Sequence, residues 1–300
     1  MTEGPGPVLV TGTSSGIGRK TTEVLSEQGH PVFAAVRRKT DMTSLAALPH
    51  VTPLLLDVTR EDTIRESIRT VEDAGQGLYG LVNNAGIVDL APLVDTPVEE
   101  LGKVLDVNLY GLHRMVRACF PLLRKAGGRV VNIGSINGVY PEEFAGAYCV
   151  SKYAVEAYSD VLRKEFAPLG IKVSLVEPGA FRSNIATNFL ARRGDSFLTA
   201  FDDSPFREVM QKSLAEYHTT PGEADRSKYP DARPVAEAVV DALFSKDPKR
   251  RYMVGTAEEA DSALTQVMRL LAQLNQRHAH SRTADELANR LRETVSQLDR

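Results

Sequence analysis

Short apolar runs alternate with longer amphipathic segments along most of the chain. The runs are rich in Val, Leu and Ile and cover residues 7–10, 31–36, 51–56, 78–86, 128–134, 171–179 and 251–255. Because most of them are apolar on both faces, they are typical of strands that lie in a parallel sheet between two layers of helices. The pattern therefore predicts a seven-stranded parallel sheet.

The segments between these runs have the spacing of helices. Apolar residues recur at three- and four-residue steps within residues 19–28, 61–74, 97–125, 148–167 and 234–246. Most of these segments begin near Asp, Ser, Thr or Pro and end near Gly or Pro, as helices do. Since helices that join parallel strands form right-handed crossovers, we expect an α/β fold with a doubly wound (Rossmann) sheet.

Two segments depart from this alternation. Residues 181–230 follow the carboxyl end of a strand, where open α/β sheets bind ligands, so we expect a substrate lid there. Residues 256–300 contain two amphipathic patterns, which predict a helical extension of a single catalytic domain over residues 1–255. We expect this extension to pack on the body or on a second subunit. Its apolar residues are Leu264, Val267, Leu270, Leu271, Leu274, Leu287, Leu291, Val295 and Leu298.

Composition narrows the possible partners. The 300 residues carry a formal net charge of −3 without a basic block, which argues against binding to nucleic acid or to an anionic membrane. Cys119 and Cys149 form no CxxC pair, and no long apolar run precedes the first strand. We therefore expect a cytoplasmic protein without a membrane anchor. The six histidines show no HExxH spacing, so we expect no metal site.

The first strand leads into a glycine-rich turn, VTGTSSGIGRK. A Walker loop needs Gly directly before Lys and Thr, whereas Arg19 separates Gly18 from Lys20. What remains is a strand, a turn with Gly12, Gly16 and Gly18, and the start of a helix, whose backbone N–H groups can bind an anion. The turn is thus typical of a site for the pyrophosphate of a dinucleotide.

Candidate chemistry lies in GAYCVSK and in VVNIGSING. Tyr148 and Lys152 are one helical turn apart, so the ammonium can favour the phenolate and make the phenol a usable acid or base. Ser135 follows a strand, where its hydroxyl can hold a substrate oxygen. A hydrolase elbow would need Gly at positions 133 and 137, where Ile133 and Asn137 stand.

Six motifs together carry a resemblance to a known family. TGTSSGIG, NNAG, the Asn of DVNLYG, the Ser of GSING, YCVSK and EPG occur in order over roughly residues 7–255. In this the chain resembles the short-chain dehydrogenase/reductase family. The stretches FAAVRR and VEPGAFRS also look like its hydroxysteroid and retinol dehydrogenase branch.

The resemblance implies roles for four catalytic residues. Tyr148 would exchange a proton with the substrate oxygen, and Ser135 would hold that oxygen. Lys152 would steady the phenolate and bind the nicotinamide ribose. Asn108 would anchor a water that extends the proton relay, although an Asn in a helix is otherwise more often a partner of the local backbone.

The resemblance also implies a cofactor site. Asp57 would meet the adenine amino group beside the Val58 backbone, the alternative being an aspartate that starts a helix. Ser183 stands where the family often has a threonine that contacts the nicotinamide carboxamide. The expected cofactor residues are Gly12, Ser14, Ser15, Gly16, Ile17, Gly18, Arg37, Arg38, Asp57, Val58, Asn84, Ala85, Gly86, Tyr148, Lys152, Pro178, Gly179 and Ser183.

The end of the second strand indicates which dinucleotide binds. An acidic residue there would favour the ribose hydroxyls of NAD, whereas Arg accommodates the 2′-phosphate of NADP. Arg37 and Arg38 occupy this position, so we expect NADP(H).

These observations favour an NADP(H)-dependent oxidoreductase that transfers hydride between the nicotinamide and a secondary alcohol or ketone. Apolar residues in the lid suggest a lipophilic substrate of steroid, retinoid or aryl-ketone type, although packing of the lid explains them too. These residues are Phe181, Ile185, Phe189, Leu190, Phe197, Leu198 and Phe206. A dinucleotide-binding sensor or scaffold without turnover is the main alternative, and a sugar-nucleotide epimerase is a third. By resemblance we expect a homo-oligomer, a dimer or a tetramer, paired through the helices at 97–125 and 148–167.

Overall fold

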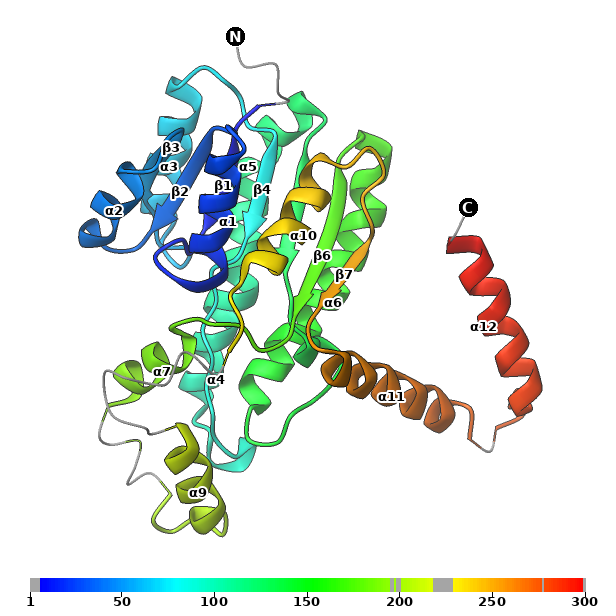
Figure 1. Cartoon of the computed structure of the whole chain (residues 1–300). Coiled ribbons are helices and arrows are strands. Elements are labelled where there is room, and N and C mark those ends of the chain that lie inside the picture. Colours follow the sequence, from blue (N-terminus) through cyan, green and yellow to red (C-terminus); the bar gives the residue numbers. More distant parts are fainter. Residues whose placement is uncertain (1–5, 195–196, 198–200, 218–228, 277, 299–300) are drawn as a thin grey trace.

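A computed structural model shows one parallel sheet between two layers of helices (Figure 1). The structure describes residues 6–194, 197, 201–217, 229–276 and 278–298. The strands follow the order β3-β2-β1-β4-β5-β6-β7, which confirms the expected doubly wound sheet. Their bounds are β1 (Val8–Thr11), β2 (Val32–Val36), β3 (Val51–Leu55), β4 (Gly80–Asn83), β5 (Arg129–Ile133), β6 (Lys172–Pro178) and β7 (Arg251–Val254).

Each face of the sheet is covered by its own set of helices and has its own hydrophobic core. In β1, Leu9 packs into one core with residues of α3 and α5, whereas Val8 and Val10 pack into a second core with α1 and α10. The helices are α1 (Gly16–Glu27), α2 (Met42–Ala46), α3 (Glu61–Asp73), α4 (Val98–Leu105), α5 (Leu112–Ala126), α6 (Gly146–Phe166), α7 (Ile185–Arg193), α9 (Arg207–Tyr217), α10 (Arg233–Phe244), α11 (Ala257–Leu274) and α12 (Ala284–Leu298). The order of strands reverses between β1 and β4, so a crevice for a ligand is expected at their carboxyl ends.

The expected continuous helix over 97–125 is interrupted. A π-helical turn at Asp106–Gly111 separates α4 from α5. At Gly111 this turn passes close to Val58, because a Cβ built on the glycine would lie 2.6 Å from the valine Cγ2. The prediction of one regular helix was therefore wrong in its middle, and π-helical turns often mark functional sites.

The segment expected to be a lid contains α7 and α9, which project below the carboxyl ends of the strands (Figure 1). Of its apolar residues, Phe189 and Phe197 are buried, whereas Ile185 and Phe206 are partly exposed. Phe181 packs against the core with α1 and α10 instead of facing the lid. Leu198 lies outside the described residues, as do 195–196, 199–200 and 218–228 of this segment.

The helical extension projects away from the sheet (Figure 1). Its start is fixed by a capping box, in which Thr256 and Glu259 bond each other's backbone N–H. In the described part of α11 and α12, the large apolar side chains are mostly exposed, including Leu264 at 61% and Leu274 at 68%. The first turns of α11 pack on the body, where Glu259 accepts a hydrogen bond of 2.8 Å from the Ala180 N–H and Ala263 is buried, whereas packing of the exposed remainder on a second subunit stays a prediction. Within the described residues, no helix is long and apolar enough to span a membrane.

Candidate active site

The glycine-rich turn brings α1 against the ends of β1 and β4. Gly12 has a φ of +71°, and a Cβ there would lie 2.9 Å from the Ala85 Cα. A Cβ on Gly18 would collide with the Gly12 carbonyl and the Asn84 side chain. Gly18 thus allows α1 to pack closely against the end of β1, and only glycine fits at Gly12 without strain.

The same turn meets the loop that follows β6. Gly16 has a φ of +58°, and a Cβ there would lie 2.8 Å from the Ser183 Cβ. The first turn of α1, with Gly16 and Ile17, carries no acidic side chain, and Ser15 at its N-cap is extended. This helix start therefore suits an anion, and the loop turn with Ser14 lies directly before it.

Thr11 and Asn84 tie β1 to β4 beneath the turn. The Thr11 hydroxyl accepts hydrogen bonds of 3.0 Å from the backbone N–H groups of Asn84 and Ala85. The Asn84 side chain donates to the carbonyls of Thr11 and Gly12 at 2.9 and 3.0 Å. Because the Asn84 amide group is bonded to these two carbonyls, the side chain of Asn84 stabilises the loop. Contact of this residue with a dinucleotide stays a prediction. The sequence signal for this role of Thr11 is a hydroxyl-bearing residue at the last position of β1, directly before the glycine-rich turn.

Arg37 and Arg38 follow β2 directly, as expected, but they differ in their partners. Arg38 donates two hydrogen bonds to Asp41, of 2.9 and 3.0 Å. Arg37 is exposed and forms no ion pair with the described residues. Of the two guanidinium groups at this strand end, that of Arg37 is thus the more accessible.

Asp57 lies in the turn after β3. Its Oδ1 accepts hydrogen bonds from the backbone N–H and the hydroxyl of Thr59, at 2.9 and 2.7 Å. The helix α3 begins at Glu61 with Arg60 as its N-cap, so Asp57 does not cap it. The neighbouring Val58 is buried, and its carbonyl accepts from Arg114 at 3.3 Å.

The remaining expected cofactor residues close β4 and β6. Gly86 faces Asn108, whose Oδ1 would lie 3.4 Å from an added Cβ. Pro178 ends β6, and the Gly179 N–H donates to the Val254 carbonyl at 2.8 Å. A Cβ on Gly179 would collide with the Glu259 carboxylate, so the extension supports this loop.

The structure brings Ser135, Tyr148 and Lys152 together. Ser135 follows β5, and its hydroxyl lies near enough to the phenol of Tyr148, in the first turn of α6, to lower the pKa of that phenol. The Nζ of Lys152 donates to the Ile133 carbonyl at 2.8 Å and lies 5.5 Å from the centroid of the Tyr148 ring. Ser135, from the loop after β5, thus joins Tyr148 and Lys152, which are one turn apart on α6, in one polar group at the carboxyl end of β5.

Burial controls the ionisation of this group. It raises the pKa of Tyr148 to about 12, against the nearby Ser135 hydroxyl, which lowers it. It also lowers the pKa of Lys152 to about 8, against the charge of Glu156, which raises it. The expectation that Tyr148 becomes easier to ionise is therefore wrong for the protein alone, because desolvation of the phenolate, to which Cys149 and Glu142 add, outweighs the lowering of the pKa by Ser135.

Asn108 lies in the π-helical turn and is 3% exposed. Its Oδ1 accepts from the Ile87 N–H at 2.8 Å, and its Nδ2 donates to the Ile87 carbonyl and the Ser151 hydroxyl, both at 2.9 Å. Ser151 directly precedes Lys152 on α6. Because both amide protons are engaged, the side chain positions α6 against the loop after β4, and a water-binding role for this residue stays a prediction.

An apolar cluster borders the phenol. Tyr148 packs against a core formed by Val88, Ala91, Phe189, Phe197, Phe201 and Met210. Phe144, which also packs there, has a φ of +62°, a conformation that non-glycine residues rarely adopt. Such strain is common at functional sites. Among the described residues, no three His, Cys, Asp or Glu side chains could together hold a metal ion.

Comparisons with known proteins agree with this geometry. The family model of short chain dehydrogenases matches residues 7–194. Retinol dehydrogenase 16 of Rattus norvegicus is 36% identical over 254 residues, which cover 83% of this chain and 80% of that protein. The mitochondrial D-beta-hydroxybutyrate dehydrogenase of Rattus norvegicus is 34% identical over 261 residues, covering 82% of this chain and 75% of that protein. A solved short-chain dehydrogenase from Streptomyces avermitilis superposes with a TM-score of 0.75 at 29% identity, covering 92% of this chain and 96% of that one.

Proposed function

The chain belongs to the short-chain dehydrogenase family, oxidoreductases that act on alcohol or ketone groups, and we propose that it uses NADP(H) and a lipophilic secondary alcohol or ketone. One observation carries this proposal. Ser135, Tyr148 and Lys152 converge at the carboxyl end of β5, next to an apolar cluster and two strands away from the glycine-rich turn that follows β1. The site therefore combines a proton donor, a dinucleotide cradle and an apolar wall.

The chain's own residues handle the proton. With a pKa of about 12, Tyr148 keeps its proton at neutral pH and can donate it to a carbonyl oxygen. The Ser135 hydroxyl next to it can hold the same oxygen. The nicotinamide, when bound, supplies the hydride, and the protein supplies orientation and proton transfer. The protonated phenol is thus the form that reduction of a ketone requires.

NADP(H) is favoured by charge at the end of β2. Arg37 is exposed and has no acidic partner among the described residues, and no carboxylate occupies the strand end. An Arg side chain can bind a 2′-phosphate with paired donors, whereas an NAD site would present an acid to the ribose.

A lipophilic substrate is favoured by the wall beside Tyr148. The buried side chains of Phe189, Phe197, Phe201 and Met210 face the same cluster as the phenol ring. The two kinds of relative point to different substrates, because one is named for retinol and the other for D-beta-hydroxybutyrate. These apolar side chains suit the former chemistry, because burying an unpaired carboxylate among them would cost free energy. The cations nearest to them, Arg192 and Arg193, stack on Phe189 and Phe197 and are held by Asp89 and Glu100.

A direct screen tests the proposal. The purified protein is mixed with NADPH and ketosteroids, retinals, aryl ketones or acetoacetate, and the loss of nicotinamide absorbance is followed, with NADP and the alcohols as the reverse test. We expect turnover of apolar ketones and little turnover of acetoacetate. Binding of NADPH without its consumption across the whole panel would instead favour a dinucleotide-binding sensor or scaffold.

A further inference from the structure

A row of polar side chains continues along α6 beyond Lys152. Tyr148, Lys152, Glu156 and Asp160 are spaced by four residues, so they follow one another along one side of the helix. Lys152 and Glu156 are both buried, with 6% and 8% of their surface exposed. Glu156 is thus the acidic side chain one turn from the lysine, on the side away from Tyr148.

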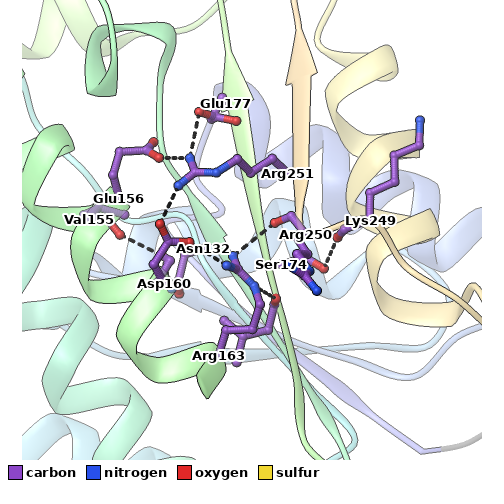
Figure 2. Close-up of polar contacts among 12 residues, drawn as sticks. Asn132, Val155, Glu156, Asp160, Arg163, Ser174, Glu177, Lys249, Arg250 and Arg251 are labelled. Carbon is purple, nitrogen blue, oxygen red and sulfur yellow. Dashed lines mark hydrogen bonds and ion pairs between the residues drawn. The ribbon is translucent and has the colours of Figure 1, made fainter. Parts of the chain in front are cut away.

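The guanidinium of Arg251, on β7, contacts the carboxylate of Glu156, as Figure 2 shows. Its Nη1 contacts the Glu156 carboxylate and lies 3.2 Å from Oε1 of Glu177 on β6, while its Nη2 lies 2.9 Å from Asp160. Glu177 is 2% exposed. One guanidinium on β7 therefore fixes two buried carboxyl groups and a more exposed one.

The other oxygen of Glu156 lies close to the lysine's own anchor. Oε1 of Glu156 is buried and has no hydrogen-bond partner within the described part of the chain. A Cβ on Gly134 or Gly138 would lie 3.3 or 2.7 Å from it. The Lys152 Nζ donates to the carbonyl of the residue directly before Gly134. The unpaired carboxylate oxygen and the ammonium thus both lie against the turn that follows β5.

The charges of this cluster balance when one of its three carboxyl groups holds a proton. Lys152 and Arg251 are the cations, and Glu156, Glu177 and Asp160 are the acids, of which Glu156 and Glu177 both contact Nη1 of Arg251. Burial raises the pKa of both glutamates, that of Glu177 to about 7, so the pair readily holds one proton between them. Arg251 favours the ionised form of Glu156, and we place the shared proton on Glu177. The negative charge then stays on the acid next to Lys152.

We propose that Glu156 is a positioning residue that keeps Lys152 positively charged beside Tyr148, and that Arg251 and Glu177 hold it there. Its importance for turnover rests on the proposed function, but its effect on Lys152 does not. The groups that face Lys152 are Tyr148 and Glu156 from α6 and the carbonyl at the end of β5. The ionisable groups that face Glu156 are Lys152, Tyr153, Asp160, Glu177 and Arg251.

Titration of Lys152 tests the proposal directly. The lysine side chains are labelled with ¹³C at Cε, and the Lys152 signal, assigned with Lys152→Arg, is followed by NMR against pH. We expect a pKa near 8 in the wild type and a value lower by about one unit in Glu156→Gln, because a favourable charge is lost. With NADPH and an accepted ketone, kcat/KM of Glu156→Gln should fall about tenfold above about pH 8 and change little near about pH 6.

Matched variants separate charge from structure. Glu177→Gln alters the same buried cluster but keeps a donor to Glu156, so the Lys152 titration should stay within about 0.3 units of the wild type. Asp160→Asn removes a more exposed partner of Arg251 and should leave both titration and turnover unchanged. Glu156→Asp keeps the charge but withdraws it by one methylene, so its titration should fall between wild type and Glu156→Gln.

The outcomes distinguish this inference from the proposed function. If Lys152 titrates in Glu156→Gln as in the wild type, the inference is overturned whatever the turnover. If its titration shifts in a protein that reduces no carbonyl compound, the inference holds and the proposed function fails. Should Glu156→Gln not fold, an unchanged Lys152 titration in Glu156→Asp overturns the inference.

Discussion

Tyr148 and Lys152 respond to the same buried surroundings in opposite directions. The phenol loses acidity and the ammonium gains it, because a dry environment favours the neutral form of each. At neutral pH the phenol therefore holds its proton, and Lys152, with a pKa of about 8, is mostly charged. This combination suits delivery of a proton to a substrate oxygen.

Arg37 gives a prediction about cofactor choice. In Arg37→Gln the KM for NADPH should rise about tenfold, because a charge-assisted hydrogen bond to the 2′-phosphate is lost. The KM for NADH should stay unchanged. Steady-state kinetics with both cofactors measure the two values.

Arg38→Gln is the matched control for this prediction. Asp41 already occupies the Arg38 guanidinium, so the KM for NADPH should rise less than in Arg37→Gln. A wild-type protein that turns over NADH as efficiently as NADPH would show that the assignment of NADP(H) is wrong.

At the residue scale, the sequence predicted where the catalytic side chains lie better than it predicted their pKa values. Tyr148 and Lys152 share a helix face by their spacing, and Ser135 follows a strand, so their convergence could be predicted. The pKa of Tyr148 could not, because it depends on burial against side chains from the lid segment, such as Phe189. The hydrogen bonds from the Asn84 amide to the carbonyls of Thr11 and Gly12 likewise depend on tertiary packing.

At the element scale, ion pairs fix α7 beside the site. Asp89, whose side chain is fully buried, lies 3.0 Å from Nη2 of Arg192 and 3.4 Å from Nε of Arg193. Both arginines also pair with Glu100 on α4. Because α7 contributes Phe189 to the cluster against Tyr148, these ion pairs connect the lid segment to the substrate wall.

Asp89→Asn should therefore loosen α7. We expect the free energy of unfolding to fall by about 1 to 3 kcal/mol, since the change removes a buried carboxylate that two half-buried arginines share. The KM for an apolar ketone should rise more than kcat falls. Urea unfolding and steady-state kinetics measure these effects.

Glu99→Gln supplies the control for Asp89→Asn. Glu99 is exposed on α4 next to Glu100, so its change should alter neither stability nor KM. Equal unfolding free energies for Asp89→Asn and Glu99→Gln would contradict the role assigned to the ion pairs.

The elements of the sheet and its covering helices could be predicted because their patterns are long and regular. The π-helical turn at Asp106–Gly111 could not, because it depends on Asn108 bonding to Ile87, far from it in the sequence. The helices α2, α7 and α9 were also not predicted. They are short or weakly amphipathic, and tertiary contacts such as those of Asp89 stabilise α7.

At the scale of the whole molecule, we propose a homo-oligomer formed through the face of α6 and the turn before α5. Tyr110, Val150 and Val161 are 46–54% exposed there, and Val150 and Val161 lie three helical turns apart on one side of α6. Val161→Glu should convert the oligomer to a monomer, because a charge would be buried at the interface. Analytical ultracentrifugation measures the change.

Leu274→Glu tests the other candidate surface. It places a charge on the exposed apolar side of α11 and should leave the oligomer intact if pairing occurs through α6. Dissociation in Leu274→Glu but not in Val161→Glu would assign the contact to the helical extension. A monomeric wild type would contradict the proposal of an oligomer.

The central claim is that the Tyr148 phenol delivers the proton, and Tyr148→Phe tests it most directly. The measurement is kcat/KM for an accepted ketone with NADPH, with NADPH affinity determined by fluorescence titration. Tyr153→Phe is the matched control on the same helix, since the Tyr153 hydroxyl donates to the Val139 carbonyl, its hydrogen-bond partner in the described part of the chain. We expect Tyr148→Phe to bind NADPH but to lose about 10² to 10⁴ in kcat/KM, and Tyr153→Phe to keep it. Wild-type turnover by Tyr148→Phe would contradict the account.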